Sequence, residues 1–211
     1  LVAIGIGKMT FGGLCCNPFN PAIVGRCFLL VSFPAAMTSW PVAGQQMAYT
    51  DAVTGATPLS LMKTAIKTGD VSVLQGLPDT VDMLLGNVAN GYGAGTIGEV
   101  CALALIAGLI WMLWRRVITW HIPVTILATV FVLSGALHAA NPVYANPMAV
   151  VLSGGLMLGA IFMATDYVTS PMTHRGQVIY AVGIGVLTVV IRNWGSYPEG
   201  MSFAILIMNA V

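Results

Sequence analysis

Apolar residues fill long stretches of the chain and leave only short polar gaps between them. About 20 apolar residues cross a hydrocarbon core of ~30 Å, and lipid offers the backbone no hydrogen-bond partner outside its own helix. The pattern therefore predicts an all-α polytopic membrane protein with about six spans in this chain. The predicted spans are residues 22–37, 97–114, 118–137, 148–164, 178–191 and a last span that begins near Met201.

The composition agrees with this pattern. Of the 211 residues, 57% are hydrophobic and only 7% are charged, whereas a soluble domain has about a quarter of charged residues. The formal net charge of +1, without a basic stripe, excludes nucleic acid as a partner and leaves membrane lipid as the natural surroundings. We treat residues 1–211 as a single transmembrane domain. Because the chain opens at Leu1 inside an apolar stretch, we expect a fragment whose upstream helices are absent.

Positive residues indicate which side of the membrane each connection faces. They gather at alternate connections, all on one side: Lys8 and Arg26, Arg115 and Arg116, His174 and Arg175. That side is predicted to be the cytoplasm, so the segment 38–96 is an extracytoplasmic loop. Arg192 breaks the pattern at the outer end of a span, where we expect it either to snorkel or to pair with Glu199.

Two Gly-Gly-Leu runs interrupt the apolar pattern, at residues 12–14 and 154–156. Each leads into an irregular stretch. Paired interruptions of this kind indicate an internal repeat with broken helices around a central site.

The outer loop contains one short amphipathic helix with clear end signals. Thr57 is a predicted N-cap, Pro58 takes the first helical position, and Gly69 follows the end. Thr57 has two interpretations. It either caps the helix only, or its hydroxyl is esterified to a phosphate, which the free N–H groups and positive dipole of a helix N-terminus stabilise.

The segment 51–57, Asp-Ala-Val-Thr-Gly-Ala-Thr, resembles the recognition sequence of the flavin transferase that attaches FMN to threonine. The chain as a whole resembles the NqrB/RnfD family of ion-pumping redox complexes. The motifs in family order are Phe11–Leu14 with Asn17–Ala22, Trp120–Pro123, Phe162–Asp166 and Tyr197–Met201. Residues 120–123 and 64–67 are more similar to RnfD than to NqrB.

This resemblance implies a fold, a cofactor and partners. The implied fold is a urea-channel-like helical bundle in a prokaryotic inner membrane. The implied cofactor is FMN joined covalently to Thr57, with Asp51, Thr54, Gly55 and Ala56 as the attachment motif. The implied partners are the flavin transferase and other subunits of one complex, among them a second flavin-bearing subunit and iron-sulfur subunits.

The function that follows is electron relay within an ion-translocating ferredoxin:NAD⁺ oxidoreductase complex of Rnf type, pumping Na⁺ or H⁺. No complete active site is expected in this chain alone, which has no Walker loop and no dinucleotide-binding glycine motif. Three alternatives remain open. They are an NqrB-like subunit of a Na⁺-translocating NADH:quinone oxidoreductase, a urea-channel-like solute transporter, and a structural scaffold.

Four other polar residues are candidates for roles in the complex. Asn17 and Asn20 either cap the first span or, as the family implies, lie near a non-covalent riboflavin. Asp166 and Glu99 either take part in ion movement or cap helices near water, since both lie close to predicted span ends. His121 is expected to be interfacial.

The four cysteines form no Cys-x-x-Cys pair and have no histidine at zinc-ligand spacing. We expect Cys15, Cys16, Cys27 and Cys101 to be small packing residues. An iron-sulfur cluster completed by other chains is the alternative.

Overall fold

The computed structural model describes residues 1–39, 56–86, 101–197 and 199–211, and every regular element in these ranges is helical. Asp51, Thr54, Gly55 and Glu99 lie outside the described residues. The helices are α1 (Pro21–Ser32), α2 (Pro34–Thr38), α3 (Pro58–Thr68), α4 (Thr80–Leu85), α5 (Ala102–Trp114), α6 (His121–Ala140), α7 (Pro147–Leu152), α8 (Leu156–Leu158), α9 (His174–Trp194) and α10 (Met201–Ala210). Short 3₁₀ or π turns cover Val2–Ile6, Met9–Phe11, Val71–Gly76 and Gly159–Met163.

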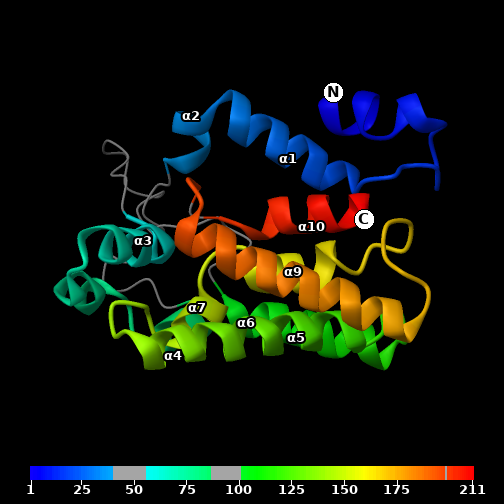
Figure 1. The fold of residues 1–211 in the computed structure, drawn as a ribbon. Coiled ribbons are helices and arrows are strands. Elements are labelled where there is room, and N and C mark those ends of the chain that lie inside the picture. Colours follow the sequence, from blue (N-terminus) through cyan, green and yellow to red (C-terminus); the bar gives the residue numbers. More distant parts are fainter. Residues whose placement is uncertain (40–55, 87–100, 198) are drawn as a thin grey trace, which may run out of the picture.

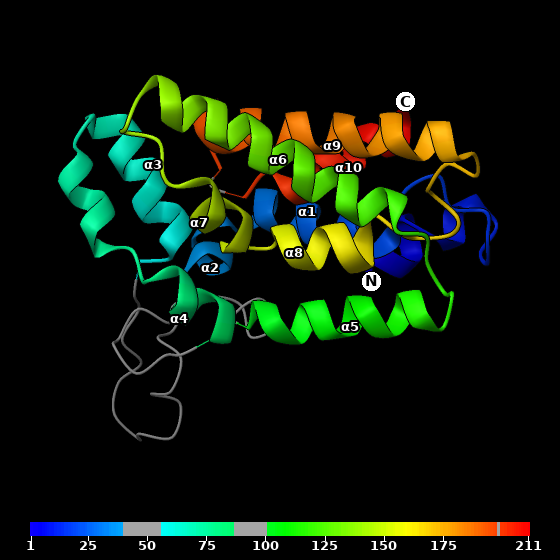
Figure 2. The same cartoon turned by 90° about the horizontal axis from the view of Figure 1, so that it is seen from below.

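The longer helices run roughly along one direction, and α3 lies across one end of the bundle (Figures 1 and 2). At the centre, α6 and α9 lie side by side. They approach closely because Gly185 has no side chain: a Cβ there would stand 2.7 Å from the Cβ of Thr129. Within the described residues, only α6 and α9 are both long and apolar enough to span a bilayer alone, at 20 and 21 residues.

The other apolar helices are shorter. α1, α5 and α10 have 12, 13 and 10 residues. Because every regular element in the described residues is helical, the all-helical prediction is confirmed for them. The number of six spans and the urea-channel-like arrangement stay predictions.

Five helices each contribute at least one fully buried aliphatic side chain to the core. Ile23, Ile126, Leu156, Ile184 and Ile205 come from α1, α6, α8, α9 and α10, and each has 0% of its surface exposed. The outside of the bundle is apolar too, with exposed side chains that include Trp111, Trp114, Val132 and Ile179. Large apolar side chains on the outside suit a surface that faces lipid.

Two predicted spans are broken. The first bends at Phe33, because Pro34 begins a new helix and disfavours helical backbone in the residue before it. The fourth ends at Leu152 and resumes at Leu156, and Gly154 between them has φ +63°. The interruption predicted at residues 154–156 is thus confirmed, and the internal repeat stays a prediction.

A second apolar cluster lies at the α3 end of the bundle. Leu59 and Met62 of α3 pack there with Met83 of α4, Ala102 of α5 and Leu152 of α7. This cluster joins the short helices of the outer loop to the broken span.

A side chain at Gly154 should destabilise the protein for two reasons, its close neighbours and the left-handed backbone conformation. Gly154→Ala puts a Cβ 3.3 Å from Cδ2 of Leu59 and 3.4 Å from Nη2 of Arg192, in addition to the ~1–2 kcal/mol that left-handed backbone costs a residue with a side chain. Gly69→Ala is the matched control, because Gly69 has φ +71° and nothing within 4 Å. We expect Gly154→Ala to lower the melting temperature of the purified protein more than the control does. If Gly154→Ala and Gly69→Ala lower the melting temperature equally, α3 does not pack tightly on Gly154.

Candidate functional site

Thr57 begins α3 as its N-cap. The Thr57 backbone is extended, at φ −71° and ψ 151°, and its Oγ1 accepts a hydrogen bond of 3.2 Å from the Ser60 amide. Pro58 occupies the first turn, and Gly69 closes the helix in left-handed conformation while its amide donates to the Ala65 carbonyl. The predicted helix with its two ends is confirmed, and the capping role of Thr57 with it.

Side chains of the buried face of α3 fix this helix on the broken fourth span. Leu59 lies over Gly154, where the absent side chain leaves room for its methyl groups. The hydroxyl of Ser153 lies 3.9 Å from the sulfur of Met62. Thr57 is thereby held at a set place beside the break.

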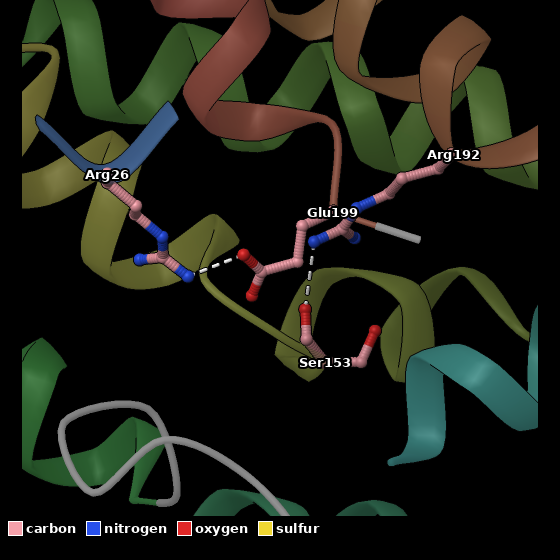
Figure 3. A network of polar contacts seen from close by, with 4 residues as sticks. All are labelled: Arg26, Ser153, Arg192 and Glu199. Carbon is pink, nitrogen blue, oxygen red and sulfur yellow. Dashed lines mark hydrogen bonds and ion pairs between the residues drawn. The ribbon is translucent and has the colours of Figure 1, made fainter. Parts of the chain in front are cut away.

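Arg192 satisfies the backbone of that break. α7 ends at Leu152, so its last carbonyls have no partner in the helix. The guanidinium of Arg192 donates to the carbonyl of Val150 at 2.8 Å. It also donates to the carbonyl of Ser153 at 3.0 Å (Figure 3). Arg192 is only 6% exposed, so of its two predicted arrangements snorkelling is wrong, and pairing with Glu199 stays a prediction. The reason is that free carbonyls in an apolar bundle attract the guanidinium inward.

Two further charged contacts tie the same region together. Arg26 of α1 forms an ion pair with Glu199, just before α10, at 2.5 Å (Figure 3). Lys63 of α3 donates to the Tyr197 carbonyl at 2.7 Å, and its side chain is buried at 8% exposure. The segment between α9 and α10 is therefore held by α1 on one side and by α3 on the other.

The ionisation of Lys63 reflects this burial. Burial lowers the pKa of Lys63 from its ordinary 10.5, and the positive charge of Lys67 lowers it further. The folded chain then binds this proton less tightly than the unfolded chain does, so the charged form costs folding free energy. That cost is complete below the lowered pKa and disappears above the ordinary one.

A small cavity of about 30 Å³, partly open to solvent, lies between α3, the end of α6, α7 and the end of α9. Its lining is mostly apolar, with Lys63 and Arg192 as two cations and no carboxylate among the lining residues. The lining residues are Leu59, Met62, Lys63, Ile66, Ser134, Leu137, Tyr144, Ala145, Val150, Val189, Arg192 and Asn193. This pocket was not predicted from the sequence.

Asn17 and Asn20 lie at the start of α1, toward the end of the bundle opposite to α3 (Figure 1). Asn20 caps α1 through hydrogen bonds from the amides of Ala22 at 3.0 Å and Ile23 at 3.5 Å. Its own amide donates to the Met163 carbonyl at 3.2 Å. The capping role of Asn20 is confirmed, and the structure does not bring these asparagines together with Thr57.

The remaining candidates have local contacts. Asp166 accepts a hydrogen bond of 3.1 Å from the Thr169 hydroxyl, as expected of a residue that caps a loop. His121 stacks between Trp120 and His174, with ring centroids 4.3 and 4.5 Å away. The stacking with His174 was not foreseen, because it joins two helix starts that are far apart in sequence.

The cysteines divide into two kinds. Cys27 is buried in the core, as a packing residue should be, and Cys101 is partly buried. Cys15 and Cys16 are exposed, so the packing prediction does not hold for these two in this chain. Among the described residues, no three histidine, cysteine or acidic side chains come together as metal ligands.

The sequence matches, over residues 1–211, the model of a family described as the NQR2, RnfD, RnfE family. It is 46% identical over 207 residues to the D subunit of the Na(+)-translocating ferredoxin:NAD(+) oxidoreductase complex of Acetobacterium woodii, covering 98% of this chain and 59% of that protein. It is 41% identical over 217 residues to the D subunit of the proton-translocating ferredoxin:NAD(+) oxidoreductase complex of Clostridium ljungdahlii, covering 100% and 62%.

A third relative is the D subunit of the ion-translocating oxidoreductase complex of Stutzerimonas stutzeri, which is 38% identical over 234 residues, covering 100% of this chain and 64% of that protein. The chain thus spans about three fifths of the length of the curated relatives it matches.

The buried ammonium of Lys63 predicts a pH-dependent stability. As pH rises toward 10.5, Lys63 loses its proton and its desolvation cost, so wild type should gain stability relative to Lys63→Met. The gap in melting temperature between the two proteins is the measurement. The control is Thr64→Val, an uncharged substitution on the exposed side of α3. Its difference in melting temperature from wild type should not change with pH. If the difference in melting temperature between wild type and Lys63→Met does not change with pH, the Lys63 ammonium is not buried as a charged group.

Proposed function

This chain belongs to the NQR2, RnfD, RnfE family, and on that premise we propose that it is the membrane electron-relay subunit of an Rnf-type complex, with FMN joined covalently to Thr57. The family resemblance found in the motifs is confirmed. The names of the relatives, which are subunits of ion-translocating oxidoreductase complexes, support the proposal that this chain is part of such a complex in a membrane. In the proposed complex, electrons move between ferredoxin and NAD⁺ while an ion is translocated. One relative is named for Na⁺ and another for the proton, so the ion stays open for this chain.

The geometry of Thr57 is the observation that supports the covalent flavin. Thr57 is half-buried, and within the described residues its hydroxyl oxygen only accepts a hydrogen bond, so the O–H is not committed to another acceptor. The Ser60 amide already points at Oγ1 of Thr57, and the N-terminus of α3 places the positive end of the helix dipole there. A phosphate dianion on Oγ1 is stabilised there. Ala56, the neighbouring member of the attachment motif, is exposed and leaves room for the transferase.

Each part of the chain has a task in this proposal. When bound, the flavin supplies the redox chemistry and exchanges electrons with centres on other subunits. The N-cap of α3 holds the phosphate. The contacts of Leu59 with Gly154 and of Lys63 with the Tyr197 carbonyl keep α3 from moving. A fixed attachment point keeps the distance to the neighbouring centres constant.

The other candidate sites extend the proposal. We assign Asn17 and Asn20 to the surroundings of a non-covalent riboflavin at the other end of the bundle, where Asn17 is 6% exposed and its amide donates to the Phe19 carbonyl at 3.0 Å. Asp166 and Glu99 are assigned to the ion pathway. The proposed partners are the other membrane and peripheral subunits, including a second flavin-bearing subunit and iron-sulfur subunits.

The covalent flavin is tested with the protein produced in a host that has its own transferase. The tryptic peptide that ends at Lys63 should be heavier by the mass of one FMN less one water, and the protein band should fluoresce under ultraviolet light after denaturing electrophoresis. Thr57→Val should lose both signals. Thr64→Val on the same helix should keep them, because its hydroxyl only donates to the Ser60 carbonyl.

An unmodified peptide in wild type would sink the covalent flavin and favour the solute-transporter alternative. If Thr57→Val loses the flavin and still turns over at the wild-type rate, the chain is a scaffold. Turnover with NADH and quinone but not with reduced ferredoxin would assign the chain to the NqrB type.

A further inference from the structure

The connection between α5 and α6 is held against the start of α9, at the end of the bundle opposite to α3 (Figure 2). The hydroxyl of Thr119 donates to Oε1 of Gln177 at 3.1 Å. The rings of His121 and His174 stack there, with their centroids 4.5 Å apart. Two segments that are far apart in the sequence therefore form one surface.

The charge on this surface is positive. Arg115 and Arg116 lie in the connection, Arg175 lies in the first turn of α9, and all three side chains are exposed. Within the described residues, none of these arginines forms an ion pair with a carboxylate. The acidic residue of the neighbouring loop, Asp166, is half-buried and accepts a hydrogen bond from Thr169. The three arginines, called the arginine surface below, are thus available to an anion.

Tryptophan side chains surround the arginine surface. Trp114 directly precedes Arg115, is 74% exposed and meets Trp111 edge to face at a centroid distance of 5.4 Å. Trp120 is 56% exposed and stacks on His121. Tryptophan is enriched where the hydrocarbon core of a bilayer meets the lipid headgroups. These side chains therefore indicate that the arginine surface lies at the depth of the headgroups.

One face of α9 continues from the arginine surface into an apolar stripe. Its exposed residues follow one another three or four positions apart: Arg175, Ile179, Val182, Val186 and Val190. From Ile179 to Val190 the stripe is about 16 Å long at 1.5 Å per residue. This is about half of the ~30 Å hydrocarbon core, which is the depth of one leaflet. A cation at the end of such a stripe matches a lipid, whereas a free anion has no acyl chain to place there.

We propose that the arginine surface binds the headgroup of an acidic phospholipid, with the three arginines as ligands of its phosphate and the apolar stripe of α9 against one acyl chain. Arginine suits this role because its planar guanidinium donates two parallel hydrogen bonds to a phosphate. Cations beside a membrane span attract acidic headgroups, which are abundant in the cytoplasmic leaflet. The side predicted to be cytoplasmic is the side where these arginines lie. This inference goes beyond the proposed function and does not depend on a flavin at Thr57.

The test is a titration of the purified complex, in a neutral detergent, with phosphatidylglycerol and in parallel with phosphatidylcholine, whose headgroup has no net charge. Native mass spectrometry measures the bound lipid. Each cation near an acidic headgroup contributes about fivefold to binding, so Arg115→Gln/Arg116→Gln should bind phosphatidylglycerol about 25-fold more weakly than wild type. Arg115→Lys/Arg116→Lys keeps the charge and should retain most of the affinity. Lys67→Gln removes an exposed charge from α3 at the other end of the bundle and should bind as wild type does.

Three results overturn the inference. If Arg115→Gln/Arg116→Gln binds phosphatidylglycerol as tightly as Lys67→Gln does, the arginine surface holds no acidic lipid. If the double variant keeps its lipid and loses another subunit of the complex, the surface is a protein interface. If inorganic phosphate displaces phosphatidylglycerol at equal concentration, the acyl chain adds nothing and the surface is a simple anion site. A weakened affinity in the double variant, together with unchanged binding of phosphatidylcholine, supports the inference.

Discussion

The α3 end of the bundle depends on the need to satisfy backbone carbonyls where a helix stops inside an apolar bundle. Water cannot reach such carbonyls freely, and each one left without a partner costs about 1–3 kcal/mol. The helix stops at Leu152 because Gly154 takes a left-handed conformation. Arg192 then enters the bundle and donates to the carbonyls of Val150 and Ser153. The break after α7 thus determines where the guanidinium of Arg192 on α9 lies.

The same break creates the place for α3. Without a side chain at Gly154, Leu59 packs directly on the interrupted backbone, and Met62 lies beside Ser153. This packing brings Lys63 to the Tyr197 carbonyl and sets the position of Thr57 at the start of the helix. The flavin proposed on Thr57 needs a rigid attachment point, because electron transfer depends on the distances between centres. The structure supplies rigidity through a short helix pinned at several points along its length.

Charge is scarce in this chain, and the few charged residues that the structure buries or half-buries make specific contacts. The ion pair of Arg26 and Glu199 joins α1 to the start of α10, which are far apart in sequence. Lys63 and Arg192 give the pocket beneath α3 a positive potential. The start of α1 has only neutral polar groups at its cap, where Asn20 bonds to the Met163 carbonyl. The pocket beneath α3 and the cap of α1 therefore differ in electrostatic character.

The sequence by itself determined the elements whose causes are local. Apolar runs predicted helices because lipid leaves the backbone no other partner, and Thr57, Pro58 and Gly69 marked both ends of α3 because capping depends on neighbouring residues. The glycines at residues 154 and 155 marked the interruption for the same reason. The motifs also carried the family, which the comparisons confirmed. What only the tertiary structure decided is where the charges go. The expectation that Arg192 snorkels was wrong, and the burial of Lys63 was not foreseen, because the carbonyls that hold them lie 39 to 134 residues away in the chain. Contacts over such separations depend on how the helices pack, which no local pattern of residues records.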